Sequence, residues 1–193
     1  MVSVNSTMLP LGTAAPAFSL PDPAGRVHDL DAIAADAPAL VVMFLSNHCP
    51  YVQHLSRELG LVTQSLAAKG AAIVGIMSND IDKYPDDSPE HMATHARVHG
   101  WDFPYLYDET QEVAAAYRAA CTPDLYVFDA DRRLVYRGQF DGSRPKNDVP
   151  VTGADLRAAV NAVLSGRPPT DDQFPSMGCN IKWRPGHEPA YFS

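Results

Sequence analysis

The most informative segment of the chain reads Ala39-Leu40-Val41-Val42-Met43-Phe44-Leu45-Ser46-Asn47-His48-Cys49-Pro50-Tyr51-Val52. Residues 39–45 form a continuous apolar run, which is typical of a buried strand. Apolar residues then recur at helical spacing as far as Leu66, which indicates an amphipathic helix over 50–68. Pro50 suits the first turn, because the N–H that proline lacks would have had no partner there. A strand therefore delivers Cys49 to a helix N-terminus, where partial positive charge stabilises a thiolate.

A lone cysteine is more often a buried structural residue than a reactive one, so a second signal is needed. That signal is Cys121-Thr122-Pro123-Asp124, which stands directly before an apolar strand pattern at 125–128. A strand, a cysteine and a helix, followed later by X-Pro and a strand, resemble the layout of the thioredoxin superfamily. In that superfamily the proline is cis and packs against the active-site cysteine. The resemblance therefore implies a cis Thr122–Pro123 bond beside Cys49.

Length and composition predict a single domain over 1–193, because 193 residues are enough for one well-buried core. A net charge of −8 argues against nucleic acid and anionic membranes as partners, since both favour basic surfaces. The sequence lacks an apolar run long enough to span a membrane and an N-terminal signal-peptide pattern. We therefore expect a cytoplasmic location, where thiols are mostly reduced.

The sequence gives no reason to expect a metal or a cofactor. His91, His95 and His99 recur at a spacing that can hold a metal, but a solvated helix face is the commoner outcome. The acidic segment 80–87 lacks the spacing of a calcium-binding loop. Glycine-rich nucleotide loops are absent. Three widely spaced cysteines do not form a disulfide scaffold either.

The remaining pattern predicts an α/β fold. Expected elements are a hairpin over 18–30, a short helix over 31–36, strands at 71–77 and 103–107, a helix over 89–98, a helix capped by Asp108 through Ala120, a hairpin over 125–140, and a last helix capped by Thr152. Residues 1–17 are expected to form an extended lead-in, and 166–193 a Pro-rich tail packed on the domain. This order predicts a thioredoxin-like three-layer sandwich with an N-terminal β-hairpin and a C-terminal extension.

The resemblance extends to several motifs, namely Asn47–Val52, Cys121–Asp124, Tyr136–Gln139, Ser143–Pro145 and Pro175–Trp183. Together they are similar to the peroxiredoxin-like redoxins of the alkyl-hydroperoxide-reductase and thiol-specific-antioxidant branch, over 11–183. Two departures matter. Val52 stands where thioredoxins carry the second cysteine of C-x-x-C. The peroxidase pattern is also incomplete, because Val42 stands where proline belongs or, in the other alignment, Val52 where the peroxidatic cysteine belongs.

The missing second cysteine has two candidate replacements. Cys121 is preferred, because in this fold the loop before the cis-proline abuts the active-site helix. The alternative for Cys121 is a buried residue that only fills the loop. Cys179 is the alternative, on a tail that would lose chain entropy on folding back over the site. Pro123 would shape the site. His48 would tune the thiolate or face solvent, Tyr51 would gate access or pack, and Arg144 would stabilise a thiolate or be solvated.

The resemblance and the cysteines favour a thiol-disulfide oxidoreductase, with Cys49 as the nucleophile and Cys121 as the resolving thiol. The alternatives are a weak thiol peroxidase with an antioxidant role and a redox-sensing or binding module without turnover. The expected partner is a protein or small-molecule thiol or disulfide, or a peroxide. The sequence leaves the oligomeric state, the substrate and the electron donor open.

Overall fold

A five-stranded mixed sheet forms the centre of the computed structural model, which describes residues 3–192. Its strand order is β6-β5-β4-β8-β9, with β4 and β5 parallel and β8 and β9 antiparallel to their neighbours. Every residue of β4 is buried, as its apolar sequence predicts. The strands are β4 (Ala39–Phe44), β5 (Ala71–Met77), β6 (Tyr105–Tyr107), β8 (Asp124–Phe128) and β9 (Leu134–Gly138).

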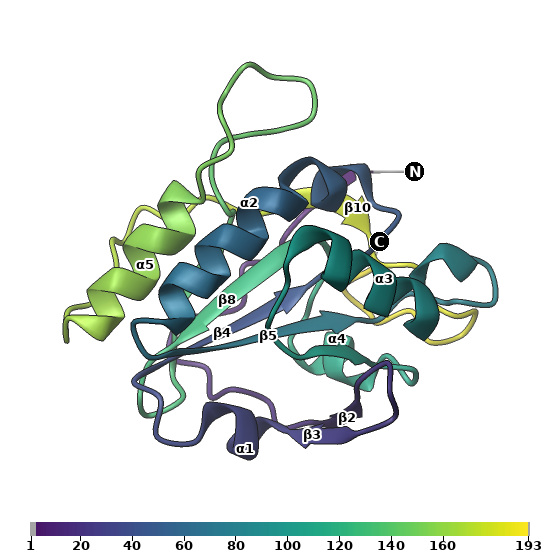
Figure 1. Ribbon diagram of the computed structural model, residues 1–193, viewed down its shortest axis with the longest axis horizontal. Helices are drawn as coiled ribbons and strands as arrows, with labels where there is room; N and C mark the ends of the chain where they lie inside the picture. Colours follow the sequence, from purple (N-terminus) through teal and green to yellow (C-terminus); the bar gives the residue numbers. More distant parts are fainter. Residues whose placement is uncertain (1–2, 193) are drawn as a thin grey trace.

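Helices cover both faces of this sheet, which makes the three layers expected from the sequence (Figure 1). Helices α2 (Pro50–Ala67) and α5 (Ala154–Leu164) lie side by side on one face, and α3 (Pro89–His99) packs against the middle of α2. The other face carries α1 (Leu30–Ala34), α4 (Glu112–Ala116) and the hairpin of β2 (Ser19–Pro21) and β3 (Val27–Asp29). A 3-10 turn, η1 (Pro85–Asp87), precedes α3. The thioredoxin-like prediction is confirmed.

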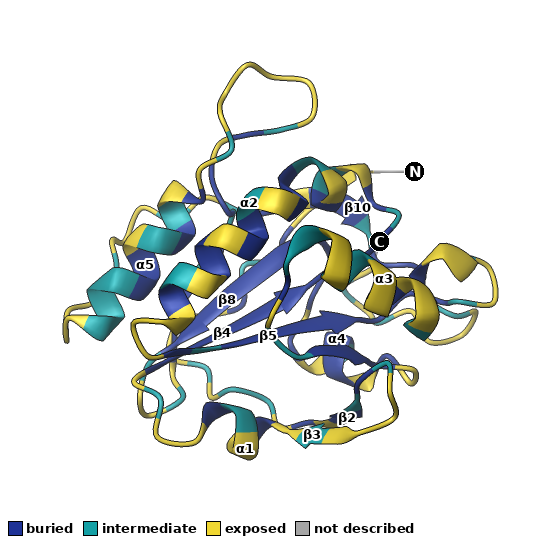
Figure 2. Cartoon of the chain, in the orientation of Figure 1, coloured by how far each residue is buried: buried dark blue, intermediate teal, exposed yellow. Residues whose placement is uncertain are grey.

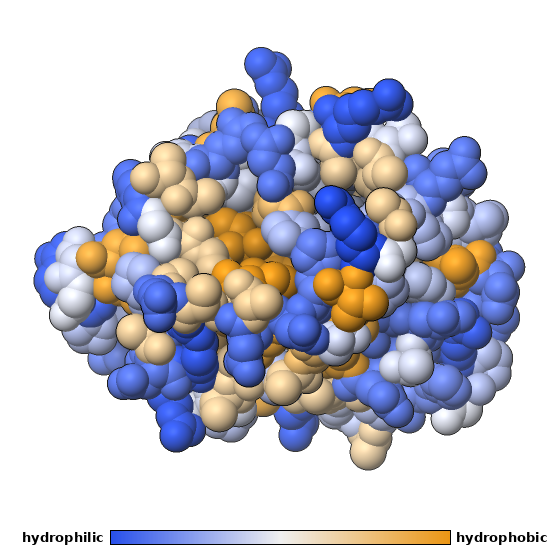
Figure 3. All heavy atoms as spheres, turned by 60° about the horizontal axis from the view of Figure 1, so that its bottom comes forward, coloured by the Kyte–Doolittle hydropathy of each residue, from blue (hydrophilic) through white to orange (hydrophobic). Residues whose placement is uncertain are grey.

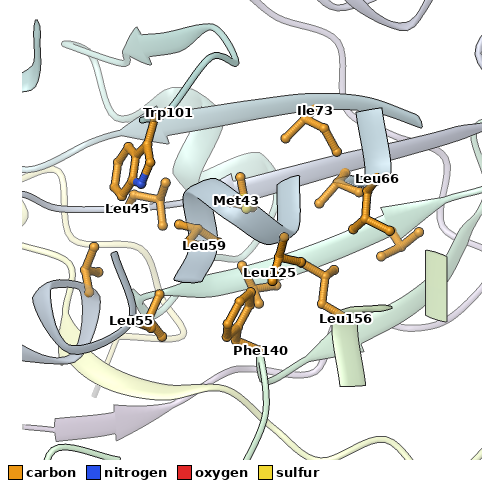
Figure 4. Close-up of a cluster of buried hydrophobic side chains, with 14 of the residues drawn as sticks. Met43, Leu45, Leu55, Leu59, Leu66, Ile73, Trp101, Leu125, Phe140 and Leu156 are labelled. Carbon is orange, nitrogen blue, oxygen red and sulfur yellow. The ribbon is translucent and has the colours of Figure 1, made fainter. Parts of the chain in front are cut away.

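The core is split by the sheet into two apolar clusters. The cluster under α2 includes Leu59, Leu66 and Met43, with Phe140 and Leu156 closing it on the α5 side (Figure 4). The second cluster lies between the sheet, α1 and α4. Buried residues gather on the sheet and on the inner faces of the helices (Figure 2). The outer surface is mixed, with apolar side chains among hydrophilic ones (Figure 3).

A small second sheet, absent from the sequence prediction, joins the two ends of the chain. It has the order β1-β10-β7, made of β1 (Ser3–Asn5), β10 (Met177–Asn180) and β7 (Cys121–Thr122). The register places Cys179 opposite both Ser3 and Thr122. A Cβ at Gly178 would collide with the Thr122 carbonyl, so β10 can lie this close only with glycine there. The tail is therefore a fixed part of the fold.

Two helix starts differ from the predicted ones. Helix α4 spans only Glu112–Ala116 and begins after Gln111, which has a positive φ of 64°. Asp108 still caps it, because its carboxylate accepts the Ala114 N–H at 2.9 Å. Helix α5 begins after Gly153, not Thr152, and the N–H groups of both residues donate to Asp141 at 2.7 Å. In each case an aspartate several residues upstream supplies the cap: Asp108 as predicted, and Asp141 where the sequence suggested Thr152. No helix within residues 3–192 is long and apolar enough to cross a membrane.

Candidate active site

Cys49 stands at the N-cap of α2, fully buried, at the point where the loop after β4 turns into the helix. Its Sγ lies 3.0 Å from the carbonyl oxygen of Thr122, to which it donates when the thiol is protonated. The Thr122–Pro123 bond is cis, as predicted, and Pro123 therefore lies next to the cysteine. The strand, the helix and the cis-proline loop thus converge on one sulfur atom.

The thiol of Cys179 makes a hydrogen bond to Cys49, and this bond is the largest cause that lowers the pKa of Cys49 to about 6. Burial opposes the shift, while the Thr122 side chain and the N–H groups of Val52 and Cys179 favour the thiolate. The Val52 N–H belongs to the first turn of α2, so the helix N-terminus contributes as expected but is not the leading cause. The same bond and burial raise the pKa of Cys179. Cys49 is therefore the thiolate of the pair.

Cys121 is buried in a different environment. Its Sγ lies 3.4 Å from the Pro123 carbonyl oxygen, and burial raises the pKa of its thiol well above the ordinary value. Its strand neighbour across the small sheet is Asn180, whereas Cys179 faces Thr122. The structure therefore brings Cys179, not Cys121, into side-chain contact with Cys49. None of the three cysteines forms a disulfide in the part of the chain that the structure describes.

A buried carboxylate, Asp87, holds the loop that presents Cys49. It accepts the backbone N–H of Asn47 at 2.6 Å, Nδ1 of His48 at 2.7 Å and Nδ2 of Asn79 at 2.6 Å, together with the Ser46 hydroxyl at 3.0 Å. Burial raises the pKa of Asp87, but the hydrogen bonds from His48, Asn79 and Ser46 hold it below its ordinary value. An ionised carboxylate can accept all of these bonds, so it fixes the whole loop.

The acidic segment 80–87, which includes Asp87, lacks a calcium-loop pattern and was not predicted to be functional. The topology provides the signal that was missed. The segment follows β5 and Cys49 follows β4, and these two strands are parallel neighbours. The carboxyl ends of parallel neighbours meet at one edge of a sheet, so the two loops had to meet.

His48 is turned away from solvent and toward Asp87. Its ring stacks on Tyr84 at 5.2 Å between centroids, and Nε2 is buried without a hydrogen-bond partner. The Asp87 hydrogen bond is the largest cause that raises the pKa of His48, and the Cys49 charge raises it further. A histidinium beside the site favours the thiolate. His48 therefore tunes the electrostatics of the site, one of the two roles considered from the sequence.

Lys182 is a second cation that sequence reasoning missed. Lys182 stands two residues after the end of β10. Its Nζ donates to the carbonyl of Asn180 at 2.7 Å and lies 5.8 Å from the centre of the Tyr84 ring. Burial lowers the pKa of Lys182, while the charges of Cys179 and Cys49 act in the opposite direction. Its backbone N–H donates to Asn79 at 2.8 Å, so the tail is tied to the loop that Asp87 holds.

A cavity of about 430 Å³ opens beside the cysteine pair. Pro50 and Tyr51 line one side, Arg144, Pro145 and Lys146 line another, and Ser3 and Cys179 complete it. Arg144 belongs to the loop that precedes α5 and projects from the molecule at the top of Figure 1. Tyr51 and Arg144 therefore lie at the entrance, without a hydrogen bond to the sulfur of Cys49 in the described part of the chain.

The chemistry that the site offers is that of two neighbouring thiols. Within residues 3–192, no group of three or more His, Cys, Asp and Glu side chains is arranged to hold a metal ion. His95 and His99 pack their rings 4.4 Å apart, and His95 also packs against Trp101, so this helix face is only partly solvated.

Residues 11–137, more than half of the chain, match the family model described as AhpC/TSA family. The chain belongs to the AhpC/TSA family. This membership confirms the resemblance to a peroxiredoxin-like redoxin and supports a thiol-dependent oxidoreductase in general terms. The search of curated proteins found no match to this chain.

Two solved structures are similar over nearly the whole chain. An uncharacterised conserved protein from Geobacillus kaustophilus is 53% identical, with a TM-score of 0.93 over 96% of this chain and 98% of that one. A hypothetical protein from Sinorhizobium meliloti is 48% identical, with a TM-score of 0.92 over 94% and 99%. The thioredoxin domain of a thiol-disulfide oxidoreductase from Bacteroides vulgatus is 17% identical, with a TM-score of 0.56 over 67% and 88%, and shares the fold.

Proposed function

We propose that this protein is a thiol-disulfide oxidoreductase whose redox pair is Cys49 and Cys179. The observation that carries the proposal is the hydrogen bond between the two thiols, which lowers the pKa of Cys49 to about 6. At neutral pH one sulfur is then ionised and the other holds the shared proton. A thiolate in contact with a second thiol is the arrangement that thiol-disulfide exchange requires.

The proposed reaction reduces a substrate disulfide and oxidises the pair. One cysteine sulfur attacks the substrate, a mixed disulfide forms and the first substrate thiolate leaves. The second cysteine sulfur attacks the mixed disulfide, so that a Cys49–Cys179 disulfide forms and the second substrate thiolate leaves. Two electrons pass to the substrate, and the proton of the pair and one from solvent convert both leaving thiolates to thiols. An external dithiol returns the pair to the reduced state by the same steps in reverse.

The sequence favoured Cys121 in the role of Cys179, and the geometry gives the reason to prefer Cys179. A free tail would lose chain entropy on reaching the site, but β10 is already paired on both sides. The Cys121 thiol instead bonds the Pro123 carbonyl oxygen at 3.4 Å, whereas the Cys179 thiol bonds Cys49 directly.

Peptide mapping under non-reducing conditions tests the pair. The reduced protein is treated with one equivalent of a disulfide oxidant and digested after the remaining thiols are blocked. A Cys49–Cys179 crosslink is expected, and it should be absent from Cys49→Ser and Cys179→Ser but present in Cys121→Ser. A Cys49–Cys121 crosslink would instead assign the role to Cys121.

A parallel assay tests the reaction class. Turnover is followed with a disulfide and with hydrogen peroxide as the oxidant, using the same dithiol as reductant. We expect turnover of the disulfide that depends on Cys49. Turnover of peroxide alone would favour the peroxidase alternative, and no turnover of either would favour a redox-sensing module.

A further inference from the structure

The cavity beside Cys179 is lined by positive charge, although the protein as a whole is acidic. The chain has a net charge of −8, yet the two charged residues that line this cavity are Arg144 and Lys146. Its other lining residues, including the thiol of Cys179, are uncharged in their ordinary states. A local cationic site on an acidic protein is a feature that selects for anionic ligands.

Arg144 is held in place by groups that leave its charge unneutralised. Its Nη1 donates to the carbonyl oxygens of Asp141 and Ser143, both at 2.7 Å, and its Nη2 donates to the side-chain oxygen of Gln139 at 2.6 Å. The Asp141 carboxylate is occupied elsewhere, because it accepts backbone N–H groups of the same loop, including that of Gly153.

The ion pairs found in residues 3–192 involve neither Arg144 nor Lys146. Lys146 is exposed on the same loop, and the exposed Asp148 nearby is not among the residues that line the cavity. Lys182 does not line the cavity, but its charge interacts with both Cys179 and Cys49 from within the fold. The two cations that line the cavity therefore keep a charge that is available to a ligand.

The size of the cavity selects for a small ligand. About 430 Å³ falls within the range of about 300–1,000 Å³ that small-molecule sites occupy. Pro50, Tyr51 and Pro145 supply apolar walls for the carbon and sulfur atoms of such a ligand. Cys179 lines the cavity, while Cys49 is fully buried and is not among the lining residues. A ligand in this cavity therefore meets Cys179 first.

We propose that this cavity binds small disulfides that carry carboxylates close to their sulfur atoms, and that the substrate sulfur joins Cys179 before Cys49 acts. The inference rests on the proposed function and specifies its substrate class. Arg144 and Lys146 bind the carboxylates and place the disulfide against Cys179.

The steps balance within the reaction given above. The Cys179 proton moves to the Cys49 thiolate through their hydrogen bond, and the Cys179 thiolate attacks the substrate disulfide. The first substrate thiolate leaves and takes a proton from the Cys49 thiol. The Cys49 thiolate then attacks the Cys179 sulfur and expels the second substrate thiolate, which takes a proton from water.

A charge series of small disulfides of similar size tests the inference. The probes are 3,3′-dithiodipropionate, which is anionic, bis(2-hydroxyethyl) disulfide, which is neutral, and cystamine, which is cationic. The fully reduced protein is mixed with excess probe, quenched with acid, and its oxidation is followed by mass. Each rate is divided by the rate of dithiothreitol with the same probe, because the leaving thiols differ in intrinsic reactivity.

We expect the anionic probe to react at least about tenfold faster than the cationic one on this normalised scale, with the neutral probe between them. Arg144→Gln and Lys146→Gln should each reduce this ratio between the anionic and the cationic probe, referred to below as the spread, and added salt should reduce it further. Arg97→Gln is the matched control, because Arg97 is exposed on α3 and does not line the cavity. Lys146 is also exposed, so its substitution leaves the fold intact. Equal normalised rates, or a spread unchanged in both cavity variants, would overturn the inference while leaving the proposed function standing.

Two further readouts separate the inference from the proposed function. In Cys49→Ser the probe should remain on Cys179 as a mixed disulfide, and a probe found only on Cys49 of Cys179→Ser would contradict entry at Cys179. If none of the probes is reduced, the proposed function fails, and the charge of the cavity is still measured by alkylation. The ratio of iodoacetate to iodoacetamide rates at Cys179 should then exceed that of free cysteine and fall in Lys146→Gln. A ratio no higher than that of free cysteine would refute the cationic site.

Discussion

Cys121 and Cys179 lie on neighbouring strands of one small sheet, yet they have opposite relations to Cys49. β7 and β10 are hydrogen-bonded partners, but the register places Asn180 rather than Cys179 across from Cys121. Cys179 makes a hydrogen bond to the Cys49 thiol, whereas the Cys121 thiol points to the Pro123 carbonyl. The comparison teaches that closeness in the fold does not make a redox pair. Which thiol contacts the thiolate depends on strand register.

The largest expected effect is the difference in disulfide turnover between the Cys179 and the Cys121 variants. Cys179→Ala should lower turnover of a disulfide to background, because it removes one of the two sulfurs that form the Cys49–Cys179 disulfide. Cys121→Ala should retain turnover within about threefold, a difference of less than about 1 kcal/mol in the barrier. Steady-state kinetics with a shared dithiol reductant measures both. Loss of turnover in Cys121→Ala with a normal thermal unfolding curve would reverse the comparison.

The next difference concerns ionisation of Cys49. Its pKa of about 6 predicts that thiolate absorbance rises with pH to half its maximum near pH 6 and is nearly complete by neutral pH. Cys179→Ala removes the largest cause of the lowered pKa, so the midpoint should move toward the ordinary value of about 8.5. At pH 6 the thiolate fraction should then fall at least about tenfold. Ultraviolet titration of the two proteins, each in the Cys121→Ala background, measures the shift.

A midpoint that stays near pH 6 without Cys179 would mean that the helix N-terminus and Thr122 suffice to stabilise the thiolate. The contact between the two thiols would then matter for resolution only.

Gly178 tests how much the small sheet matters. Gly178→Ala places a Cβ against the Thr122 carbonyl, so β10 must shift away from the cis-proline loop. Overpacking of this kind costs about 1–3 kcal/mol of stability, and the shift should also raise the pKa of Cys49 by weakening its bond to Cys179. Gly142→Ala is the control, because its Cβ would meet nothing closer than 3.9 Å. Denaturant unfolding and the thiolate titration give the two readouts.

The smallest expected effect is that of Lys182, which acts on the thiolate only through its charge. Lys182→Met keeps the length of the side chain and removes the charge that interacts with Cys49 and Cys179. Because Lys182 does not donate a hydrogen bond to the sulfur in any contact described above, the pKa of Cys49 should rise by less than about one unit. The same thiolate titration measures it. A shift as large as that in Cys179→Ala would make Lys182, and not the second thiol, the leading stabiliser.

The sequence predicted the half of the site that depends on local patterns. The apolar run before Cys49, the helical spacing after it and Pro50 specify strand, turn and helix, and Thr122–Pro123 specifies the cis-proline loop. These features are local, so the chain displays them directly.

The other half depends on pairing between distant segments. β10 has only the residues Met177–Asn180 and shows no clear alternation, so nothing in its sequence marks it as a strand. Its position depends on β1 and β7, from the beginning and the middle of the chain, and on the fit of Gly178 against Thr122. The same is true of Asp87, whose role is visible only once β4 and β5 are known to be parallel neighbours.

The pairing of β10 with β1 and β7 also sets when, during synthesis, the protein acquires its reactive sulfur. Cys49 leaves the ribosome well before Cys179, the residue that most lowers its pKa, because β10 follows every other strand of the small sheet in the chain. Until β10 has been synthesised and has paired with β1 and β7, the pKa of Cys49 is closer to that of an ordinary thiol. The nascent chain is thereby less exposed to unwanted crosslinking, and redox competence arrives together with the closing of the small sheet.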